Sequence, residues 1–558
     1  MMNTTFSYNN YWKYEQLTAN LRLLADRYPG LAKLESLAKT PEGRDIWAMT
    51  ITDPSTGPAA GKPAFYVDGS HHAGEVTGSM SAAYFADFLL TNSDTSRVGK
   101  LLRDYTFYVL PRVSPDGAEY YLTTPDRVRS VNRPYPCEQP LPGLRAADMD
   151  GDGVIRSMRV KSPYGMWKVS PIDPRLMVQR KPDETEGEFY NVYPEGYIEG
   201  YDGLEINEAP SPYGSDFNRN YPIAWAPESG QKGAGIYPLS NIETRTVADF
   251  IIGHKNIGSV ITFHTWGGMF LFPPGFIPSK KADPEDMARY HEIGKIATEE
   301  TGYPVVNLFD EYTPEGEDIS SGAMDDWCHF DRGIPAYTIE CWDLKPRAGI
   351  PHVWPQPASL TPDEQAEEMA KLMKWNDENL DGEGFSGWTP AVHPQLGFVE
   401  YGGFDYKFMF QNAPPKFLRQ EAEKHTRYIL RAATLLPKVT VDRVDARKLG
   451  EGVYEVTAVV GNCGYLPTYL TKEALKLGVD SPVKVCVSLP AEGGSTREIG
   501  HLQGRSNVQT SFGAFGFSTR SEQQRAVKWI VRAEAGSRYT VRVESKTGGC
   551  AEMTKTLA

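Results

Sequence analysis

The feature of this sequence that most limits its fold is a change of pattern near residue 437. Before it, short apolar runs such as PAFYVDG, SVITFHTW and AYTIECW alternate with stretches of helical spacing. Such alternation is typical of a mostly parallel sheet with helices on both faces. After it, VYEVTAVVGN, VKVCVSLP and SRYTVRVES follow one another with turns and almost no helix, as in a β-sandwich. The sequence therefore predicts an α/β domain with a mixed, mostly parallel sheet over 1–437, and an all-β sandwich domain over 438–558.

Two stretches of the first domain lack a clear period. Residues 134–213 are rich in Pro, Gly, Asp and Tyr and are too many for an ordinary connection, so we expect an insertion. Residues 345–396 are irregular around one helix, for which Thr361 is the expected N-cap and Pro362 the first residue.

The chain has 58 basic and 72 acidic side chains, a formal net charge of −14. This charge has the wrong sign for holding nucleic acid or an anionic membrane surface, so neither partner is expected.

No run approaches the roughly 18 apolar residues that span a bilayer, and no signal peptide is recognisable. Because the six cysteines are scattered and form no CxxC pair, we expect a cytoplasmic protein, with export by a non-standard route as the alternative.

The string YVDGSHHAGE leads from a strand into a turn just before a helix. His72 and Glu75 lie three residues apart in it, so an imidazole and a carboxylate can converge on one point. Zinc accepts such ligands, and in catalytic sites it takes a third protein ligand and keeps an open position. A His-x-x-Glu pair arises easily by chance, and His71 is either the ligand instead or a polar residue that fills the turn.

Two more polar residues end apolar strands. His264 ends SVITFH, where an isolated histidine is most often a hydrogen-bonded core residue, and Glu340 ends AYTIE, where an unpaired carboxylate is costly to bury. Open α/β sheets place their sites at the carboxyl ends of strands. We therefore expect His72 with Glu75, His264 and Glu340 to meet at one edge of the sheet.

Over residues 8–436 the chain resembles the carboxypeptidase A-like family of zinc carboxypeptidases. The similarity rests on motifs that follow the family's order, which are EGRDI (42–46), HxxE (72–75), SPDG (114–117), DFNRN (216–220), NIET (241–244), FHTW (263–266), SGAMDDW (321–327) and IECWD (339–343). Trp327 and Glu340 are 13 residues apart, which matches the family's spacing without a gap. The last region, with GNCGYLPTY, resembles a β-sandwich appended to some bacterial relatives.

The resemblance implies a metallocarboxypeptidase that acts on peptides with a free C-terminus. It implies one Zn²⁺ per chain, with a water in the fourth position and three protein ligands, His72, Glu75 and His264. It also implies that Glu340 is the general base, which takes a proton from the water and passes it to the leaving amine.

Further family roles fall on neighbouring motifs. Asp216 resembles the carboxylate that orients the first histidine ligand from behind. Asn218 and Arg219 resemble the pair that holds the terminal carboxylate of the substrate. For the arginine that stabilises the oxyanion, RVRSVNRP offers Arg129 and Arg133, and we expect Arg133 after allowing a one-residue shift.

The chain departs from the family's pattern at two places. Many relatives have an arginine inside HxxE where this chain has Gly74, so one charge that anchors the substrate is missing. The family's mobile active-site tyrosine falls on Asp318, and Tyr312 is the residue that could replace it. Weaker anchoring of the terminal carboxylate would admit amides or unusual peptides.

The same gapless count places Asp325 at the floor of the pocket for the terminal side chain. In the family an acidic residue there accompanies a preference for C-terminal Lys or Arg, because a buried carboxylate needs a cationic partner. The alternative is that Asp325 caps a helix or pairs locally.

Inside the insertion, DMDGDGVI has the pattern of the first half of an EF-hand loop, with carboxylates from Asp148, Asp150 and Asp152. Arg159 occupies the place of the bidentate glutamate, so a further ligand must come from elsewhere. We expect structural Ca²⁺ here, with a plain acidic turn as the alternative.

Three functions remain open on these residues. A zinc metallocarboxypeptidase comes first, and a zinc amidohydrolase or peptidase of the same fold, acting on cell-wall peptides or acylated amino acids, comes second. A binding protein without catalysis comes last, because the three ligand residues and Glu340 are all present.

Overall fold

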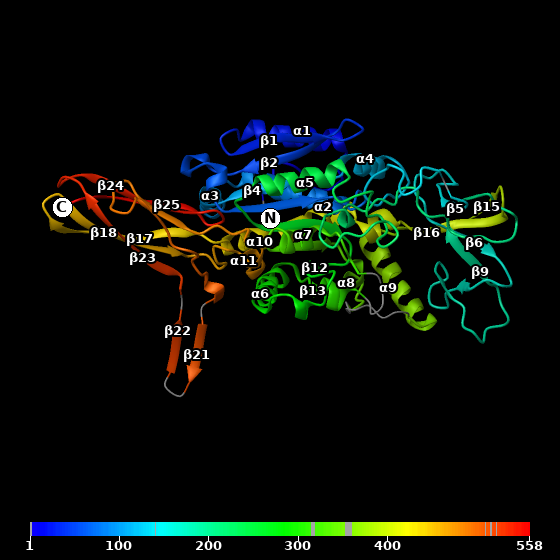
Figure 1. The fold of residues 1–558 in the computed structure, drawn as a ribbon. Helices are drawn as coiled ribbons and strands as arrows, with labels where there is room; N and C mark the ends of the chain where they lie inside the picture. The colour runs from blue at the N-terminus through cyan, green and yellow to red at the C-terminus, as the bar shows by residue number, and fades with distance from the viewer. Residues whose placement is uncertain are drawn as a thin grey trace.

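The computed structural model describes residues 3–139, 141–313, 319–351, 360–507, 509–513, 516–520 and 522–558. At its centre lies an eight-stranded sheet (Figure 1) in the order β1 (Ala32–Lys39), β2 (Asp45–Ile51), β4 (Thr106–Leu110), β3 (Ala64–Gly69), β11 (Ile257–Thr265), β14 (Ala336–Cys341), β12 (Met269–Phe272) and β13 (Val305–Asn307). The four central strands β4, β3, β11 and β14 are parallel. Strands β1 and β2 pair antiparallel with their neighbours, and β12 pairs antiparallel with β14 but parallel with β13. The mixed, mostly parallel α/β sheet is confirmed.

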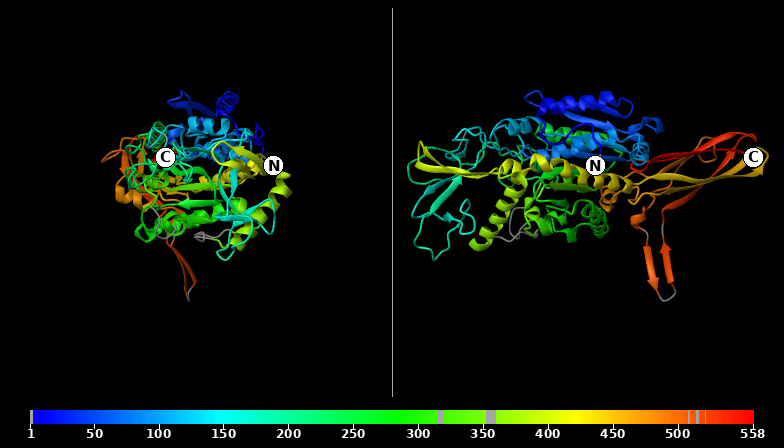
Figure 2. Two further views of the ribbon diagram at one scale, coloured as in Figure 1. Left: turned by 90° about the vertical axis from the view of Figure 1, so that its right-hand side faces the viewer. Right: turned by 180° about the vertical axis from the view of Figure 1, so that it is seen from behind.

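Helices cover both faces of this sheet. The helices between residues 14 and 432 are α1 (Tyr14–Arg27), α2 (Val76–Thr91), α3 (Ser96–Asp104), α4 (Pro115–Thr123), α5 (Ile242–Gly253), α6 (Pro284–Thr301), α7 (Met324–Phe330), α8 (Leu344–Arg347), α9 (Pro362–Leu380), which packs on α8 and β8 (Met177–Gln179), and α10 (Pro415–Ala432). Helices α5 and α7 lie in front in Figure 1, whereas α10 lies in front when the molecule is seen from behind (Figure 2).

Helix α2 is buried along nearly its whole length. It approaches the sheet closely because Gly78 has no side chain, and a Cβ atom there would lie 2.7 Å from the carbonyl oxygen of Phe263. This contact fixes the start of α2, and with it the preceding turn that carries Glu75, against the end of β11.

The insertion contains strands that the sequence did not reveal. They are β5 (Gly143–Ala146), β6 (Ser157–Lys161), β7 (Trp167–Val169), β8 (Met177–Gln179), β9 (Tyr190–Pro194) and β10 (Gly196–Glu199). Strands β6 to β9 join β15 (Phe385–His393) and β16 (Gly397–Phe404) in a six-stranded sheet, and β5 pairs with β10. We call β5–β10 with β15 and β16 the insert module. Strands of three to five residues are too short to show a period of two.

The helix expected inside the second irregular stretch is present as α9. Its N-cap is Thr361, whose hydroxyl accepts a hydrogen bond from the backbone N–H of Glu364, and Pro362 is its first residue. The side chain of Glu364 accepts a hydrogen bond from the backbone N–H of Thr361, which completes a capping box. These predictions are confirmed.

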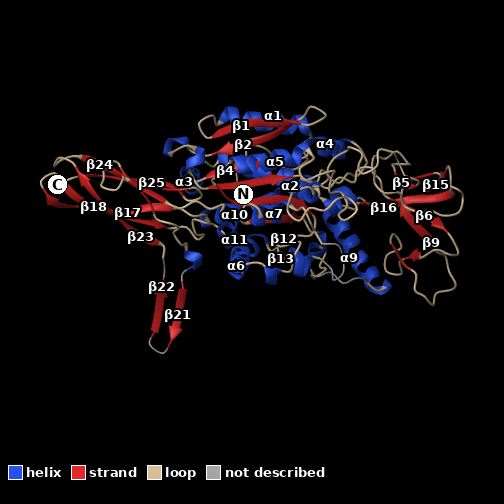
Figure 3. Ribbon diagram, in the orientation of Figure 1, coloured by secondary structure: helices blue, strands red, loops and turns tan. Residues whose placement is uncertain are grey.

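After α10 the chain forms strands almost alone (Figure 3). They are β17 (Val439–Gly450), β18 (Val453–Asn462), β19 (Lys484–Val487), β20 (Thr496–Glu498), β21 (Gln509–Gly513), β22 (Gly516–Arg520), β23 (Gln524–Arg532), β24 (Arg538–Ser545) and β25 (Gly549–Thr556), with one short helix, α11 (Lys472–Leu477). The sheets β17-β18-β23 and β20-β19-β24-β25 enclose one core around Val456, Trp529 and Val541. The predicted all-β sandwich is confirmed, and we call residues 438–558 the β-region and the preceding part the α/β body.

The β-region and the insert module lie at opposite ends of the molecule (Figure 1). The β-region packs at the amino ends of the central strands, because a Cβ atom on Gly549 would lie 2.7 Å from Pro63, just before β3. Its Leu466 and Leu470 belong to the main core of the α/β body, and Lys438 forms an ion pair of 2.7 Å with Asp104 of α3.

No helix in the described part of the chain is long and apolar enough to cross a membrane.

Candidate active site

The register of the sheet brings the predicted site residues together. His72 and Glu75 lie in the turn between β3 and α2, His264 lies near the end of β11, and Glu340 lies near the end of β14. His264 and Glu340 are direct partners in the parallel pairing of β11 with β14, and Phe263 pairs with Gly69 at the end of β3. All four side chains therefore gather at the carboxyl edge of the sheet.

His72, Glu75 and His264 form a buried triad. The Nδ1 atoms of the two imidazoles lie 3.1 Å apart, and they lie 2.8 Å and 2.9 Å from the two carboxylate oxygens of Glu75. Two ring nitrogens and a carboxylate that face one point are a donor set suited to Zn²⁺. The residues present therefore fit the implied metal.

Asp216 orients the first of these histidines. Its Oδ1 atom lies 3.0 Å from Nε2 of His72, on the side of the ring that faces away from the triad. Asp216 caps the short 3-10 helix Phe217–Arg219 and accepts a hydrogen bond from the backbone N–H of Asn218. Burial alone would raise the pKa of Asp216, but the charges of Arg129 and His72 hold it well below its usual range. The carboxylate is thus ionised behind its imidazole.

Glu340 presents a buried oxygen, Oε2, that has no hydrogen-bond partner among the described residues. Burial, and next the charge of Glu75, raise the pKa of Glu340 to about 8. Leaving such an oxygen without a partner costs free energy, so its retention beside the triad indicates a chemical role. A divalent cation at the triad would favour the ionised form of Glu340.

The structure corrects the choice between the two arginines. Arg129 donates from Nε to Asp216 over 3.0 Å and from Nη1 to Glu75 over 3.3 Å. Arg133 faces away and donates two hydrogen bonds of 2.8 Å to Glu243. The backbone explains this placement, because the carbonyl of Arg129 accepts a hydrogen bond from the N–H of Ala73 in the His72 turn. Arg129, rather than the expected Arg133, is therefore the arginine that contacts the triad.

Asn218 and Arg219 lie beside the triad on the loop that Asp216 caps. The side-chain oxygen of Asn218 accepts a hydrogen bond from the backbone N–H of Met324 at the start of α7. Arg219 donates to the carbonyl of Asn218 and to the hydroxyl of Ser320, and no carboxylate forms an ion pair with it in the described part of the chain. Its guanidinium retains capacity for a ligand carboxylate.

Two neighbouring carboxylates are buried at the start of α7. Asp325 accepts hydrogen bonds from the hydroxyl of Thr338 and the N–H of Asp326, and Asp326 accepts from the N–H of Gly275. Burial raises the pKa of both groups, and neither forms an ion pair within the described residues. The sequence indicated Asp325 but gave no signal for Asp326.

Tyr312 ends the turn Leu308–Tyr312 that follows β13. Burial, and next the charge of Glu340, raise the pKa of its phenol to about 12, while Arg129 and Arg219 act in the opposite direction. Glu340, Arg129 and Arg219 therefore act electrostatically on this phenol. Asp318, on which the family's tyrosine position falls, lies outside the described residues.

Gly74 is closely packed, so a side chain there would require its neighbours to shift. A Cβ atom at Gly74 would lie 2.9 Å from the amide nitrogen of Gln411 and 2.9 Å from the ring of Tyr121. The neighbouring His71 is also occupied, since its Nε2 lies 2.8 Å from the hydroxyl of Tyr221, and it stands outside the triad.

The acidic turn of the insert module has one partner that the sequence did not identify. Asp148, Asp150 and the buried Glu195, which lies between β9 and β10, offer oxygen atoms within 4.8 Å of one another. Asp152 instead pairs with Arg156, and Arg159 pairs with Glu400 over 2.7 Å.

Comparison with known proteins gives two family matches. The model of the zinc carboxypeptidase family matches residues 17–359, and that of a domain of unknown function matches residues 438–556. The chain is similar to carboxypeptidase B from Astacus astacus, with 24% identity over 347 residues that cover 60% of this chain and 88% of that protein. An inactive metallocarboxypeptidase, ECM14, from Ajellomyces capsulatus is 30% identical over 148 residues, 26% of this chain and 24% of that protein.

Among solved structures, carboxypeptidase A from Helicoverpa armigera aligns with a TM-score of 0.40 and 20% identity, over 67% of this chain and 76% of that one. The family match covers more than half of the sequence and includes the whole triad and Glu340. The chain belongs to the zinc carboxypeptidase family.

Proposed function

We propose that this protein is an active zinc-dependent metallocarboxypeptidase, which hydrolyses the C-terminal peptide bond of peptides. The observation that carries the proposal is the buried, unpartnered oxygen of Glu340 beside the convergent triad of His72, Glu75 and His264. A scaffold that only binds peptides would gain stability by pairing or replacing that carboxylate.

In this proposal each residue acts through the contacts described above. When bound, zinc polarises the scissile carbonyl and lowers the pKa of water. Glu340 accepts the proton of the attacking water and delivers it to the leaving amine. Arg129 stabilises the negative charge that develops on the carbonyl oxygen. Asn218 and Arg219 hold the terminal carboxylate of the peptide.

Tyr312 completes the proposed site. Its phenol lies under the electrostatic influence of Glu340, Arg129 and Arg219, although it comes from a different position of the chain than the family's tyrosine. We infer that it donates a hydrogen bond to the bound peptide. Its raised pKa keeps the phenol protonated, and therefore a donor, at neutral pH.

Substitution of Glu340 tests the general base. In Glu340→Gln, kcat for a C-terminal peptide should fall by about 10²–10⁴-fold, because proton transfer is lost, while zinc content stays at one per chain. Glu383→Gln, an exposed site, is the matched control and should keep full activity. Chelation by o-phenanthroline should abolish activity and added zinc restore it. Equal turnover by Glu340→Gln, or a wild-type protein that binds zinc and cleaves no peptide, would contradict the proposal.

We further propose a preference for C-terminal Arg or Lys. Asp325 and Asp326 support it, because two buried carboxylates without an ion pair in the described part of the chain favour a cationic side chain. Hippuryl-Arg should be hydrolysed with a higher kcat/KM than hippuryl-Phe. Asp325→Asn should lower kcat/KM for hippuryl-Arg by about tenfold or more and change that for hippuryl-Phe less. An equal or reversed preference in the wild-type protein would rule out the basic pocket.

The packing around Gly74 favours one alternative substrate class. Position 74 is a glycine and supplies no guanidinium. Among the described residues, Arg219 beside Asn218 is then the arginine that would hold a terminal carboxylate. A zinc amidohydrolase or peptidase for cell-wall peptides or acylated amino acids would tolerate this weaker anchoring of the terminal carboxylate. Comparing one peptide with its C-terminal amide separates the two, since a carboxypeptidase needs the free carboxylate.

We also propose two domains, 1–437 and 438–558, and a Ca²⁺ ion in the insert module. The second family match, which begins at residue 438, supports the division.

Asp148, Asp150 and Glu195 support the proposed Ca²⁺ ion, since hard cations prefer carboxylate oxygens.

A further inference from the structure

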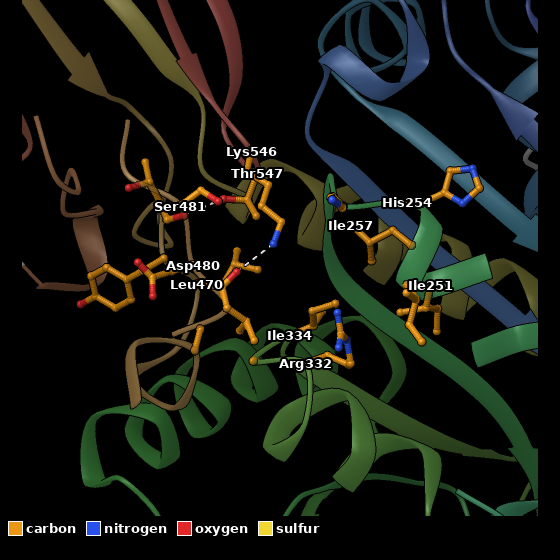
Figure 4. Close-up of a pocket in the computed structure, with 17 residues that line it drawn as sticks. Ile251, His254, Ile257, Arg332, Ile334, Leu470, Asp480, Ser481, Lys546 and Thr547 are labelled. Atoms are coloured by element: carbon orange, nitrogen blue, oxygen red, sulfur yellow. Dashed lines mark hydrogen bonds between the residues drawn. The ribbon is translucent and has the colours of Figure 1, made fainter. Parts of the chain in front are cut away.

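A small cavity lies where the β-region meets the α/β body, at the end of the sheet opposite the triad (Figure 4). Its volume is about 40 Å³. The α/β body contributes the ends of α5 and α7 and the start of β11, and the β-region contributes the segments around Leu470, Asp480 and Lys546. We call it the seam cavity.

Three cationic side chains line the seam cavity: Lys255, Arg332 and Lys546. In Figure 4 Lys546 enters from the β-region and Arg332 from the α/β body. Burial, and then the charges of Arg332 and Lys255, lower the pKa of Lys546, so the three groups lie within electrostatic reach of one another. Like charges that gather in this way destabilise the protein unless an anion offsets them.

The protein itself compensates these charges only in part, since Asp480 acts on Lys546 and Asp331 acts on Arg332 without forming an ion pair among the described residues. Among the lining residues Asp480 is the single carboxylate, and its Oδ2 lies 2.6 Å from Nε2 of His501. None of the three cations has an ion pair in the described part of the chain. Lys546 donates one hydrogen bond, of 2.9 Å, to the carbonyl of Val479, which leaves further N–H groups for a ligand. In a chain with a net charge of −14, this is a local excess of positive charge.

A second, larger cavity of about 500 Å³ shares Lys255, Ser481 and Lys546 with the first. Its other two cations are already neutralised, since Arg542 pairs with Glu544 over 2.7 Å and Lys484 pairs with Glu498 over 3.5 Å. An anionic group would therefore bind at the seam cavity, and any remainder of the ligand would extend into the larger space.

We propose that the seam cavity binds a phosphate group. A phosphate carries about 1.5 to 2 negative charges at neutral pH and several strong acceptor oxygens, which match two lysines, one arginine and the hydroxyl of Ser481. The ligand is either inorganic phosphate or a phosphomonoester. By contacting both parts of the chain, it strengthens their junction.

Calorimetric titration of the full-length protein with inorganic phosphate at low ionic strength tests this. We expect one site per chain, and at least a tenfold weaker Kd in Lys546→Gln and in Arg332→Gln. Lys280→Gln removes the same charge at an exposed position and should bind phosphate like the wild-type protein. Sodium chloride at equal ionic strength should give no saturable binding.

Two further arms make the result decisive. Phosphate should raise the Tm of the wild-type protein and leave that of Lys546→Gln unchanged, which checks the site even if Arg332→Gln fails to fold. Tighter binding of phenyl phosphate than of phosphate would assign the site to a phosphomonoester, and equal or weaker binding would assign it to inorganic phosphate. Absence of binding at about 10 mM of either compound would mean a Kd weaker than roughly the millimolar range, and it would overturn the proposal. An equal loss of binding in Lys280→Gln would also overturn it.

Discussion

Arg129 joins the two carboxylates that organise the proposed catalytic centre. It contacts Glu75 within the triad and Asp216 behind His72, so one guanidinium neutralises a metal ligand and the group that orients another. Arg133, four residues later, pairs with Glu243, which is fully buried. The two arginines thus have different expected roles although they lie on the same segment.

Separate alanine variants distinguish these roles. Arg129→Ala should lower kcat by about 10²–10³-fold at saturating zinc, because an oxyanion donor is lost. Arg133→Ala should keep kcat within a few fold but lower the free energy of unfolding by about 2–3 kcal/mol, since Glu243 is left buried without its partner. Urea denaturation and steady-state kinetics measure both effects. A catalytic loss in Arg133→Ala and none in Arg129→Ala would restore the sequence-based choice.

At the scale of single residues, the sequence predicted what strand ends determine. His264 and Glu340 terminate apolar runs, and parallel register alone brings them together. The position of Arg129 depends on how an irregular segment folds against the His72 turn. Glu195 lies 43 residues beyond Asp152 in the sequence, and no sequence pattern marks Asp326 as a site residue. Such contacts arise from loop geometry, which has no period to detect.

At the scale of elements, the sequence predicts the helices and the long strands, but it does not predict the strands of the insert module. Helix α9 has its N-cap, first-turn proline and capping-box glutamate in consecutive order. The six-stranded sheet of the insert module instead pairs β6 with β16, whose partners Arg159 and Glu400 are far apart in the chain. Without knowledge of its partner, a strand of this length has no recognisable face.

The turn between β5 and β6 gives a prediction at this scale. If Ca²⁺ binds Asp148, Asp150 and Glu195, calcium at about 100 times Kd should stabilise the protein by about 2.7 kcal/mol. Glu195→Gln and Asp148→Asn should remove this gain, because each deletes a charged ligand, and the exposed Asp183→Asn should keep it. Thermal unfolding with calcium and with chelator measures the effect. An unchanged Tm together with metal-free protein would identify a plain acidic turn.

At the scale of the whole molecule, the β-region and the α/β body share a hydrophobic core. Leu466 and Leu470 of the β-region pack among residues of the central sheet and its helices. We therefore expect the two parts to lose structure together rather than independently.

Unfolding experiments check this coupling. The wild-type protein should show one transition, and Leu466→Ala should lower the free energy of unfolding by about 2–5 kcal/mol, since Leu466 is 2% exposed. Leu449→Ala, at a site that is 48% exposed, should change it by less than about 0.5 kcal/mol. Two well-separated transitions in calorimetry of the wild-type protein would show that the shared core does not couple them.

The insert module has a consequence for synthesis of the chain. Strand β6 pairs with β16, and residues 195–384 lie between β9 and β15. At about 5–20 residues per second, a ribosome needs on the order of 10–40 s to supply the missing strands. During that time the nascent chain holds Leu144 and Met158 without Val399 and Tyr401, their later neighbours. The insert module therefore stays incomplete, and accessible to chaperones and proteases, during this part of translation.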